Sequence, residues 1–116
     1  MILLNFIKDL KNFIFYKKVE KNYTVGFFCE NKFIFNYLEP YILNKVKKKK
    51  IVLISFENID LNNNDNVNLF VFKTNLIREL IFLTLKLKFL YSSTPDLNNT
   101  IFKRSKFSNC KYIYLQ

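Results

Sequence analysis

The chain has 116 residues, half of them apolar and 18% aromatic, so it is long enough for one domain with a packed core. That composition argues against an intrinsically disordered chain. The net charge is +10, but of the 19 basic residues only Arg78 and Arg104 are arginines. Because arginine supplies the planar fork that grips phosphate and base edges, a charge built from lysine argues only weakly for a nucleic-acid partner.

Several kinds of site are excluded by residues that the sequence lacks. The chain has no histidine, which removes Ser-His-Asp and Cys-His pairs and histidine metal ligands. Gly26 is the single glycine, so the dinucleotide fingerprint and the P-loop are absent in their usual forms. Cys29 and Cys110 lie far apart in sequence, which argues against a zinc site. We therefore expect neither a metal nor a cofactor.

The amino-terminal segment does not resemble a secretory signal. Residues 1–7 are apolar, but Asn5 interrupts them and Lys8 follows at once. No stretch approaches the roughly 20 apolar residues that a membrane span needs. We expect a cytoplasmic protein with reduced thiols, with peripheral attachment to the inner face of the membrane as an option.

Residues 1–22 are predicted to form an amphipathic helix followed by a charged connector over Lys17–Asn22. Apolar residues recur every three or four positions, at Leu3, Phe6, Ile7, Leu10, Phe13 and Ile14. Lys8, Asp9, Lys11 and Asn12 fall on the other side. We expect the apolar stripe to pack against the sheet or a second lobe, and the alternative is that it lies in a membrane interface.

Residues 23–116 are predicted to form an α/β domain, a Rossmann-like open parallel sheet with helices on both faces. Continuous apolar runs are typical of strands that are covered on both sides. The expected strands are Tyr23–Cys29, Ile51–Phe56, Leu69–Phe72, Phe89–Ser92 and Tyr112–Leu115.

Helices are expected between these strands. Asn31 can cap the first, Asn75–Lys86 forms the second, and Ile101–Phe107 forms a short basic third. Pro40 should kink or break the helix after Asn31. The expected inward side chains of that helix are Phe33, Ile34, Tyr37, Leu38, Tyr41, Ile42 and Val46, and those of the second are Leu76, Ile77, Leu80, Ile81 and Leu83. Asn58–Asn68 is interpreted as a polar surface loop.

Candidate substrate-binding residues follow two of the predicted strands. Ligands of open parallel sheets bind at the carboxyl ends of the strands, where Glu30, Asn31, Ser93 and Thr94 are expected. Arg104, with its lysine neighbours, is a candidate contact for a phosphate. Each has an ordinary alternative, since Asn31 can cap a helix, Ser93 and Thr94 suit a turn, and Arg104 suits an exposed helix face.

Lys45 and Lys47–Lys50 form a basic run between a predicted helix and a predicted strand. One interpretation is contact with an anionic membrane surface, to which each lysine can add about 1 kcal/mol. The other is a solvated helix end, where cations oppose the negative end of the helix dipole.

Part of the chain resembles a known family. The segment Lys88–Gln116 has a strand leading into Ser93-Thr94-Pro95, then Leu97, Lys103-Arg104-Ser105 and a strand over Tyr112–Leu115. Together with the strand end Gly26–Glu30 and the helix carrying Leu38 and Pro40, it is similar to the CDP-glycerol glycerophosphotransferase family, the teichoic-acid primases and polymerases.

The resemblance implies the amino-terminal, acceptor-side lobe of a two-lobed GT-B transferase. Such enzymes move glycerol phosphate from CDP-glycerol onto a hydroxyl acceptor at the inner face of the membrane, in cell-envelope polymer synthesis. Their catalytic histidines lie beyond the strand matched by Tyr112–Leu115, so no catalytic residue carries over to this chain. We expect a fragment that is inactive alone and whose partner is the remaining lobe. The alternatives are a non-catalytic basic module that binds an anionic membrane and, less favoured because no basic-aromatic recognition motif is present, an RNA-binding domain.

Overall fold

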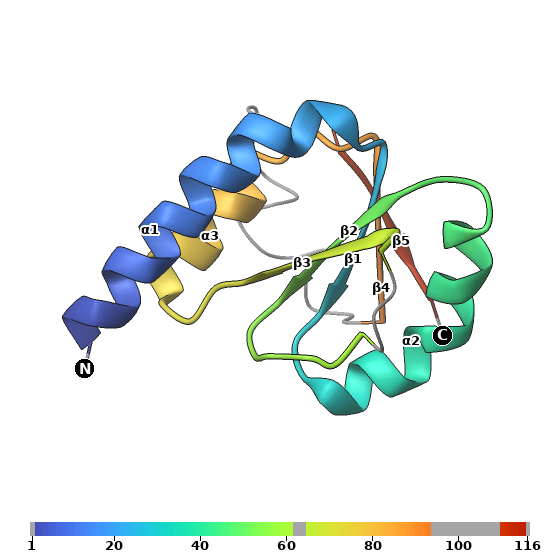
Figure 1. Cartoon of the computed structure of the whole chain (residues 1–116), viewed down its shortest axis with the longest axis horizontal. Coiled ribbons are helices and arrows are strands. Elements are labelled where there is room, and N and C mark those ends of the chain that lie inside the picture. Colours follow the sequence, from blue (N-terminus) through green and yellow to red (C-terminus); the bar gives the residue numbers. More distant parts are fainter. Residues whose placement is uncertain (1, 62–64, 94–109, 116) are drawn as a thin grey trace.

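The computed structural model describes residues 2–61, 65–93 and 110–115, and the described strands form one parallel sheet (Figure 1). Its order is β3-β2-β1-β4-β5. Every neighbouring pair is parallel. The strands are β1 (Val25–Cys29), β2 (Ile51–Ser55), β3 (Val67–Val71), β4 (Phe89–Ser92) and β5 (Lys111–Tyr114). The predicted Rossmann-like parallel sheet is confirmed, and the helix expected over Ile101–Phe107 lies outside the described residues.

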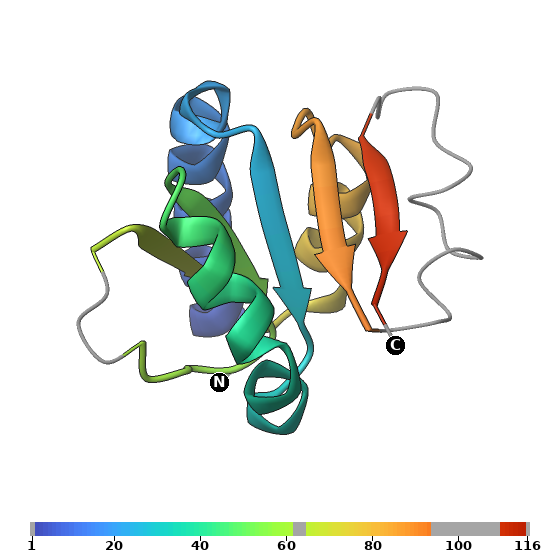
Figure 2. The same cartoon turned by 90° about the vertical axis from the view of Figure 1, so that its right-hand side faces the viewer.

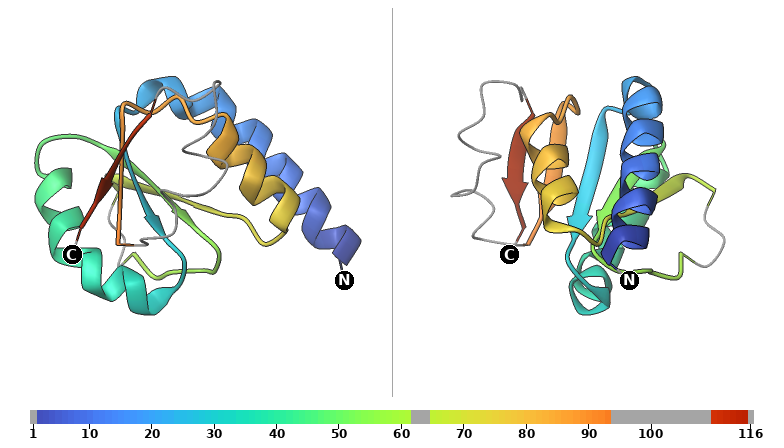
Figure 3. Two further views of the ribbon diagram at one scale, coloured as in Figure 1. Left: turned by 180° about the vertical axis from the view of Figure 1, so that it is seen from behind. Right: turned by 90° about the vertical axis from the view of Figure 1, so that its left-hand side faces the viewer.

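Helices cover both faces of this sheet, as predicted. The described helices are α1 (Ile2–Val19), the 3-10 turn η1 (Glu20–Asn22), α2 (Lys32–Val46) and α3 (Asn75–Leu83). Helices α1 and α3 lie side by side on one face, and α2 lies on the other (Figures 2 and 3). Two core layers result, one between the sheet and α1–α3 and one between the sheet and α2.

The central strands are apolar throughout because helices pack on both of their faces. Every residue of β1 and of β2 is buried. Gly26 in β1 is required by close packing, since a Cβ built there would lie 2.6 Å from Cδ1 of Leu87 and 3.0 Å from Cγ1 of Val52. The single glycine of the chain therefore leaves room for the buried side chains of Leu87 and Val52.

Helix α2 is rotated relative to the prediction. Its buried residues are Phe35, Leu38 and Ile42. Three side chains that were expected to point inward are exposed instead, namely Phe33, Tyr37 and Tyr41. Apolar residues occur on all sides of this helix, so periodicity alone could not select the buried side. Of the kink or break predicted at Pro40, the break is excluded, because the helix continues through that residue. The helix changes direction along its length (Figure 1).

The segment around α3 also differs from the prediction. The strand before it begins at Val67, two residues earlier than expected. Ile59, in the segment interpreted as a polar surface loop, is buried in the α2 layer. Helix α3 ends at Leu83 and not at Lys86, and Leu76 on it is exposed while Ile77 and Ile81 are buried.

The largest correction concerns α1, where only part of the predicted inward stripe packs on the core and one residue of the expected polar side, Asp9, is buried. Asp9 and Tyr16 are buried, and Phe6 and Phe13 pack partly against the same core layer. The rest of the predicted inward stripe, Leu3, Ile7, Leu10 and Ile14, is exposed. These aliphatic side chains, which were expected to pack on the sheet or on a second lobe, instead lie on the outer surface of the molecule.

Asp9 explains this orientation, because its carboxylate binds the backbone at the start of α3. The N–H of Lys73 donates to both carboxylate oxygens, at 3.0 and 2.8 Å. The N–H and the hydroxyl of Thr74 donate to Oδ2 at 2.6 and 2.7 Å. A helix N-terminus carries unpaired N–H donors and a partial positive charge, so a buried carboxylate is stabilised there.

Glu20 binds the other end of α3. Its buried carboxylate accepts hydrogen bonds from the hydroxyl of Tyr16 at 2.7 Å and from the N–H of Lys86 at 3.0 Å. It also pairs with Nζ of Lys17 at 3.0 Å, and the same ammonium donates to the carbonyl of Thr84. The predicted connector over Lys17–Asn22 is therefore the end of α1 and the turn η1, which join α1 to the chain after α3.

No helix in the described part of the chain is long and apolar enough to cross a bilayer.

We predict that Asp9→Ala lowers the free energy of unfolding by about 2 kcal/mol, because it leaves the partly buried N–H donors of Lys73 and Thr74 without their acceptor. Urea denaturation followed by circular dichroism measures the change. Lys11→Ala, at an exposed position of the same helix, is the matched control and should change the value by less than about 0.5 kcal/mol. A loss for Asp9→Ala as small as that of the control contradicts the assigned role of the carboxylate.

Candidate functional site

The order of the strands reverses between β1 and β4. The chain passes from β1 outward through β2 to β3 and then returns to the other side of β1, where Phe27 pairs with Tyr91. The arrows of β1, β4 and β5 point the same way in Figure 2, so their carboxyl ends meet at one edge. Open parallel sheets bind ligands outside this edge at such a switch point.

Two predicted site residues follow β1 at this edge. The Asn31 side chain accepts a hydrogen bond from the N–H of Ile34 at 2.9 Å and caps α2, so its ordinary role is the one observed. Glu30, the residue before it, is exposed. The next strand end is tied to this one, since Oε1 of Glu57 accepts from the N–H of Lys32 at 2.6 Å.

Ser93 follows β4 and is half-buried at the same edge. Its neighbour Ser92 accepts a hydrogen bond at its carbonyl from the N–H of Leu115 at 2.7 Å, which holds the end of β5 beside the end of β4. Glu30, Asn31 and Ser93 thus all lie at the carboxyl-end edge that the sequence predicted. Thr94 and Arg104 lie outside the described residues.

Arg78 in α3 is a charged residue of this edge that sequence reasoning did not assign to the site. Its guanidinium stacks on the ring of Phe56 with the Cζ atom 3.7 Å from the ring centroid, and its Nε donates to the carbonyl of Phe72 at 2.8 Å. Both of those residues directly follow strands, β2 and β3. A signal was present in the composition, since arginine is rare in this lysine-rich chain and its planar guanidinium can stack on a ring as lysine cannot.

Electrostatics connects Arg78 to the predicted residues. Burial lowers the pKa of its guanidinium, and the carboxylates of Asp9 and Glu30 oppose that shift. Glu30 therefore lies within electrostatic reach of Arg78. The edge therefore presents the guanidinium of Arg78, held against the ends of β2 and β3, and the carboxylate of Glu30, which follows β1. Such a pair of opposite charges suits a ligand with both phosphate and hydroxyl groups.

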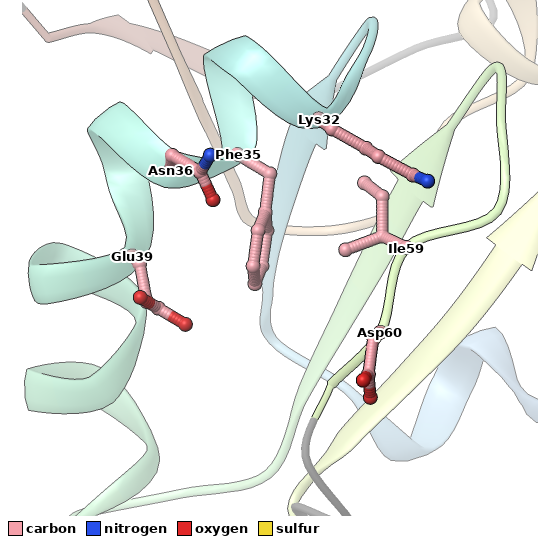
Figure 4. A pocket seen from close by; sticks show the side chains of 6 residues that line it. All are labelled: Lys32, Phe35, Asn36, Glu39, Ile59 and Asp60. Carbon is pink, nitrogen blue, oxygen red and sulfur yellow. The ribbon is translucent and has the colours of Figure 1, made fainter.

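A shallow pocket of about 340 Å³ opens beside this edge, between the first half of α2 and the loop after β2 (Figure 4). Phe35, Asn36 and Glu39 of the helix lie on one side of it and Ile59 and Asp60 of the loop on the other, while the side chain of Lys32 extends over Ile59. Sequence reasoning missed this pocket because Ile59 was placed in a polar surface loop. Within the described ranges, the Cys, Asp and Glu side chains form no group of three that could hold a metal ion.

The basic run lies away from this edge. Lys47–Lys50 are exposed in the turn between α2 and β2, where the strands begin. The N–H groups of Lys48 and Lys49 donate to the carbonyl of Lys45, at 3.0 and 3.2 Å, and close the end of α2. Lys45 itself is half-buried, with Nζ 5.0 Å from the ring centroid of Tyr91. Lys45 therefore packs against the sheet, whereas its four neighbours face solvent.

No protein-family model, no curated protein and no solved structure matches this chain.

Cys29 ends β1 beside the candidate edge, but its environment does not favour a reactive thiolate. The side chain is fully buried, and burial raises the pKa of its thiol to about 12. Burial likewise raises the pKa of the Cys110 thiol to about 12, with a smaller contribution from the charge of Glu20. A nucleophilic cysteine needs a lowered pKa, so neither thiol is suited to nucleophilic catalysis.

We predict that Cys29 makes the fold less stable in alkali. Above a pH of about 9 the unfolded thiol loses its proton while the folded thiol, with its raised pKa, keeps it. The unfolded state then binds fewer protons, so the free energy of unfolding falls with pH, by at most about 1.4 kcal/mol per pH unit for this group. Urea denaturation at several pH values between about 8 and about 10 measures the slope of the free energy of unfolding against pH.

The matched variant is Cys29→Ala, which removes this titration and should show a shallower fall over the same range. Equal slopes for the two proteins contradict the assignment.

Proposed function

We propose that this chain is the acceptor-binding lobe of a two-lobed transferase of the glycerophosphotransferase type. The observation that carries the proposal is the switch point between β1 and β4, with Glu30 and Ser93 at the adjoining carboxyl ends. The sequence resemblance supplies the reaction class, and the strand order supplies a site of the kind that such a lobe requires.

The chemistry of the acceptor accounts for the charges at this edge. In the proposed reaction an acceptor hydroxyl attacks the phosphorus that carries glycerol in CDP-glycerol, CMP departs, and a new phosphodiester forms. An acceptor lengthened in this way carries one negative charge for each unit added. Arg78 can pair with such a phosphate, and Glu30 can accept a hydrogen bond from a glycerol hydroxyl.

The fixed position of Arg78 supports this role. Its ring stacking and its bond to the carbonyl of Phe72 hold the guanidinium against the ends of β2 and β3. A group that is already ordered loses little conformational entropy when it binds a ligand, and transfer of a phosphoryl group depends mainly on positioning and charge stabilisation. The proton acceptor of the reaction is assigned to the other lobe, because this chain contains no histidine.

The test is titration of the full chain with a short glycerol phosphate oligomer, followed by amide chemical shifts. We expect the largest shifts at residues that follow β1 and β4, including Glu30 and Ser93. Arg78→Gln should weaken binding about tenfold, which corresponds to the loss of one charge-assisted hydrogen bond.

Lys11→Gln is the matched control, because it removes the same charge at an exposed position on α1. It should weaken binding less than about twofold if the site is specific. Equal losses for the two variants, or shifts confined to the lysines of the turn before β2, contradict an acceptor site at this edge.

A further inference from the structure

Helix α1 carries an exposed apolar surface that the fold leaves uncovered in the described part of the chain. Six side chains form this surface, called here the outer stripe, and each is between 40% and 69% exposed: Leu3, Leu4, Ile7, Leu10, Ile14 and Phe15. Helix α3 lies beside α1 (Figure 3), and Leu76 on it is also exposed, at 56%. A cluster of large exposed apolar side chains on one element marks an interaction surface.

The charges of α1 are all of one sign on the outside. Lys8, Lys11 and Lys18 are exposed along the helix, among or beside the outer stripe. Asp9 is the single acidic residue of α1, and it is buried against the start of α3. The helix therefore presents apolar side chains and positive charge together.

We propose that the outer stripe docks into the interface of an anionic lipid bilayer. Leucine, isoleucine and phenylalanine side chains can enter the boundary between headgroups and acyl chains, while the lysines beside them extend their charged ends to the headgroups. The length of α1, 18 residues, and its mixture of Leu, Phe and Lys fit a helix that lies in the plane of the interface.

Charge argues for this occupant over a second copy of the chain. Each copy carries a net charge of +10, so two copies joined through α1 would bring lysines of both helices together. The cores of protein interfaces are depleted in lysine, whereas the surface of an anionic membrane attracts it. A membrane is thus the occupant that matches both the apolar and the basic part of the stripe.

The proposal places the docking surface elsewhere than the basic run of the sequence. Lys47–Lys50 follow α2, which covers the opposite face of the sheet from α1. Lys18 and Lys21 are instead exposed at the end of α1 and in the turn η1, and Lys86, whose N–H bonds to Glu20, is exposed after α3. These lysines add to the attraction on the side of α1.

The experiment is co-sedimentation of the full chain with vesicles of phosphatidylcholine, with and without about a third of phosphatidylserine. Serine headgroups are chosen so that no glycerol phosphate headgroup can occupy the proposed acceptor site. We expect binding that needs the anionic lipid. The double variant Ile7→Ser/Ile14→Ser should lower vesicle binding at least about tenfold, because it removes two inserted side chains.

Two variants serve as controls. Phe33→Ser removes an apolar side chain that is 80% exposed on α2 and should leave binding unchanged within about twofold. Replacing Lys47–Lys50 together by glutamine should weaken binding less than the double variant does. Circular dichroism of each variant checks that it is folded. We expect all of them to fold, because the replaced side chains are exposed.

The proposal is overturned if the chain does not sediment with anionic vesicles, or if the Lys47–Lys50 variant abolishes binding while the double variant retains it. It is also overturned if the wild-type chain is a dimer that the double variant dissociates, or if the outer stripe is needed for binding single-stranded RNA and not vesicles. None of these outcomes bears on the glycerol phosphate titration, so the two proposals fail separately.

Discussion

The fold depends on the attachment of α1 to α3 by two buried carboxylates. Asp9 accepts hydrogen bonds from the backbone at the start of α3, and Glu20 accepts one from the N–H of Lys86 beyond its end. Each carboxylate accepts charge-assisted hydrogen bonds from partly buried backbone donors, and one such bond is worth about 1.5 to 3 kcal/mol. Burial raises the pKa of Tyr16, whose hydroxyl donates to Glu20, and the charge of that carboxylate acts in the same direction. Together these contacts fix the rotation of α1 about its own axis.

That rotation has consequences on both sides of the helix. On the inner side, the rings of Phe6, Phe13 and Tyr16 fill the space against the α3 layer, and the ring of Tyr16 meets that of Phe70 edge-on with centroids 5.1 Å apart. On the outer side, the aliphatic stripe remains exposed, which is the basis for the proposed membrane contact. The observed orientation buries aromatic rings and also gives the N–H groups at the start of α3 a hydrogen-bond acceptor. The aliphatic stripe has no polar group that could accept those hydrogen bonds, so burying it instead would be less favourable.

The same contacts set the position of the candidate site. With α3 held at both ends, Arg78 lies over the ring of Phe56 and against the carbonyl of Phe72, where β2 and β3 end. Glu30 follows β1 at that edge, and its charge acts on the guanidinium. The proposed acceptor site and the proposed membrane surface thus share one structural cause, although they lie on different parts of the molecule and are tested separately.

Local sequence predicted the parallel sheet and placed the ends of the described strands within two residues, because continuous apolar runs need cover on both faces. It also predicted the cap by Asn31, because an asparagine before a helix can accept hydrogen bonds from the first N–H groups. Glu30 and Ser93 were placed at the correct edge for the same reason, since parallel strands bring their carboxyl ends together. The rotation of α1 and α2, the position of Arg78 and the pocket beside Ile59 were decided by the tertiary structure. A prediction from periodicity assumes that the most apolar side of a helix is the buried one. It fails for α1, because the N–H groups of Lys73 and Thr74, 64 and 65 positions further along the chain, take Asp9 as their acceptor.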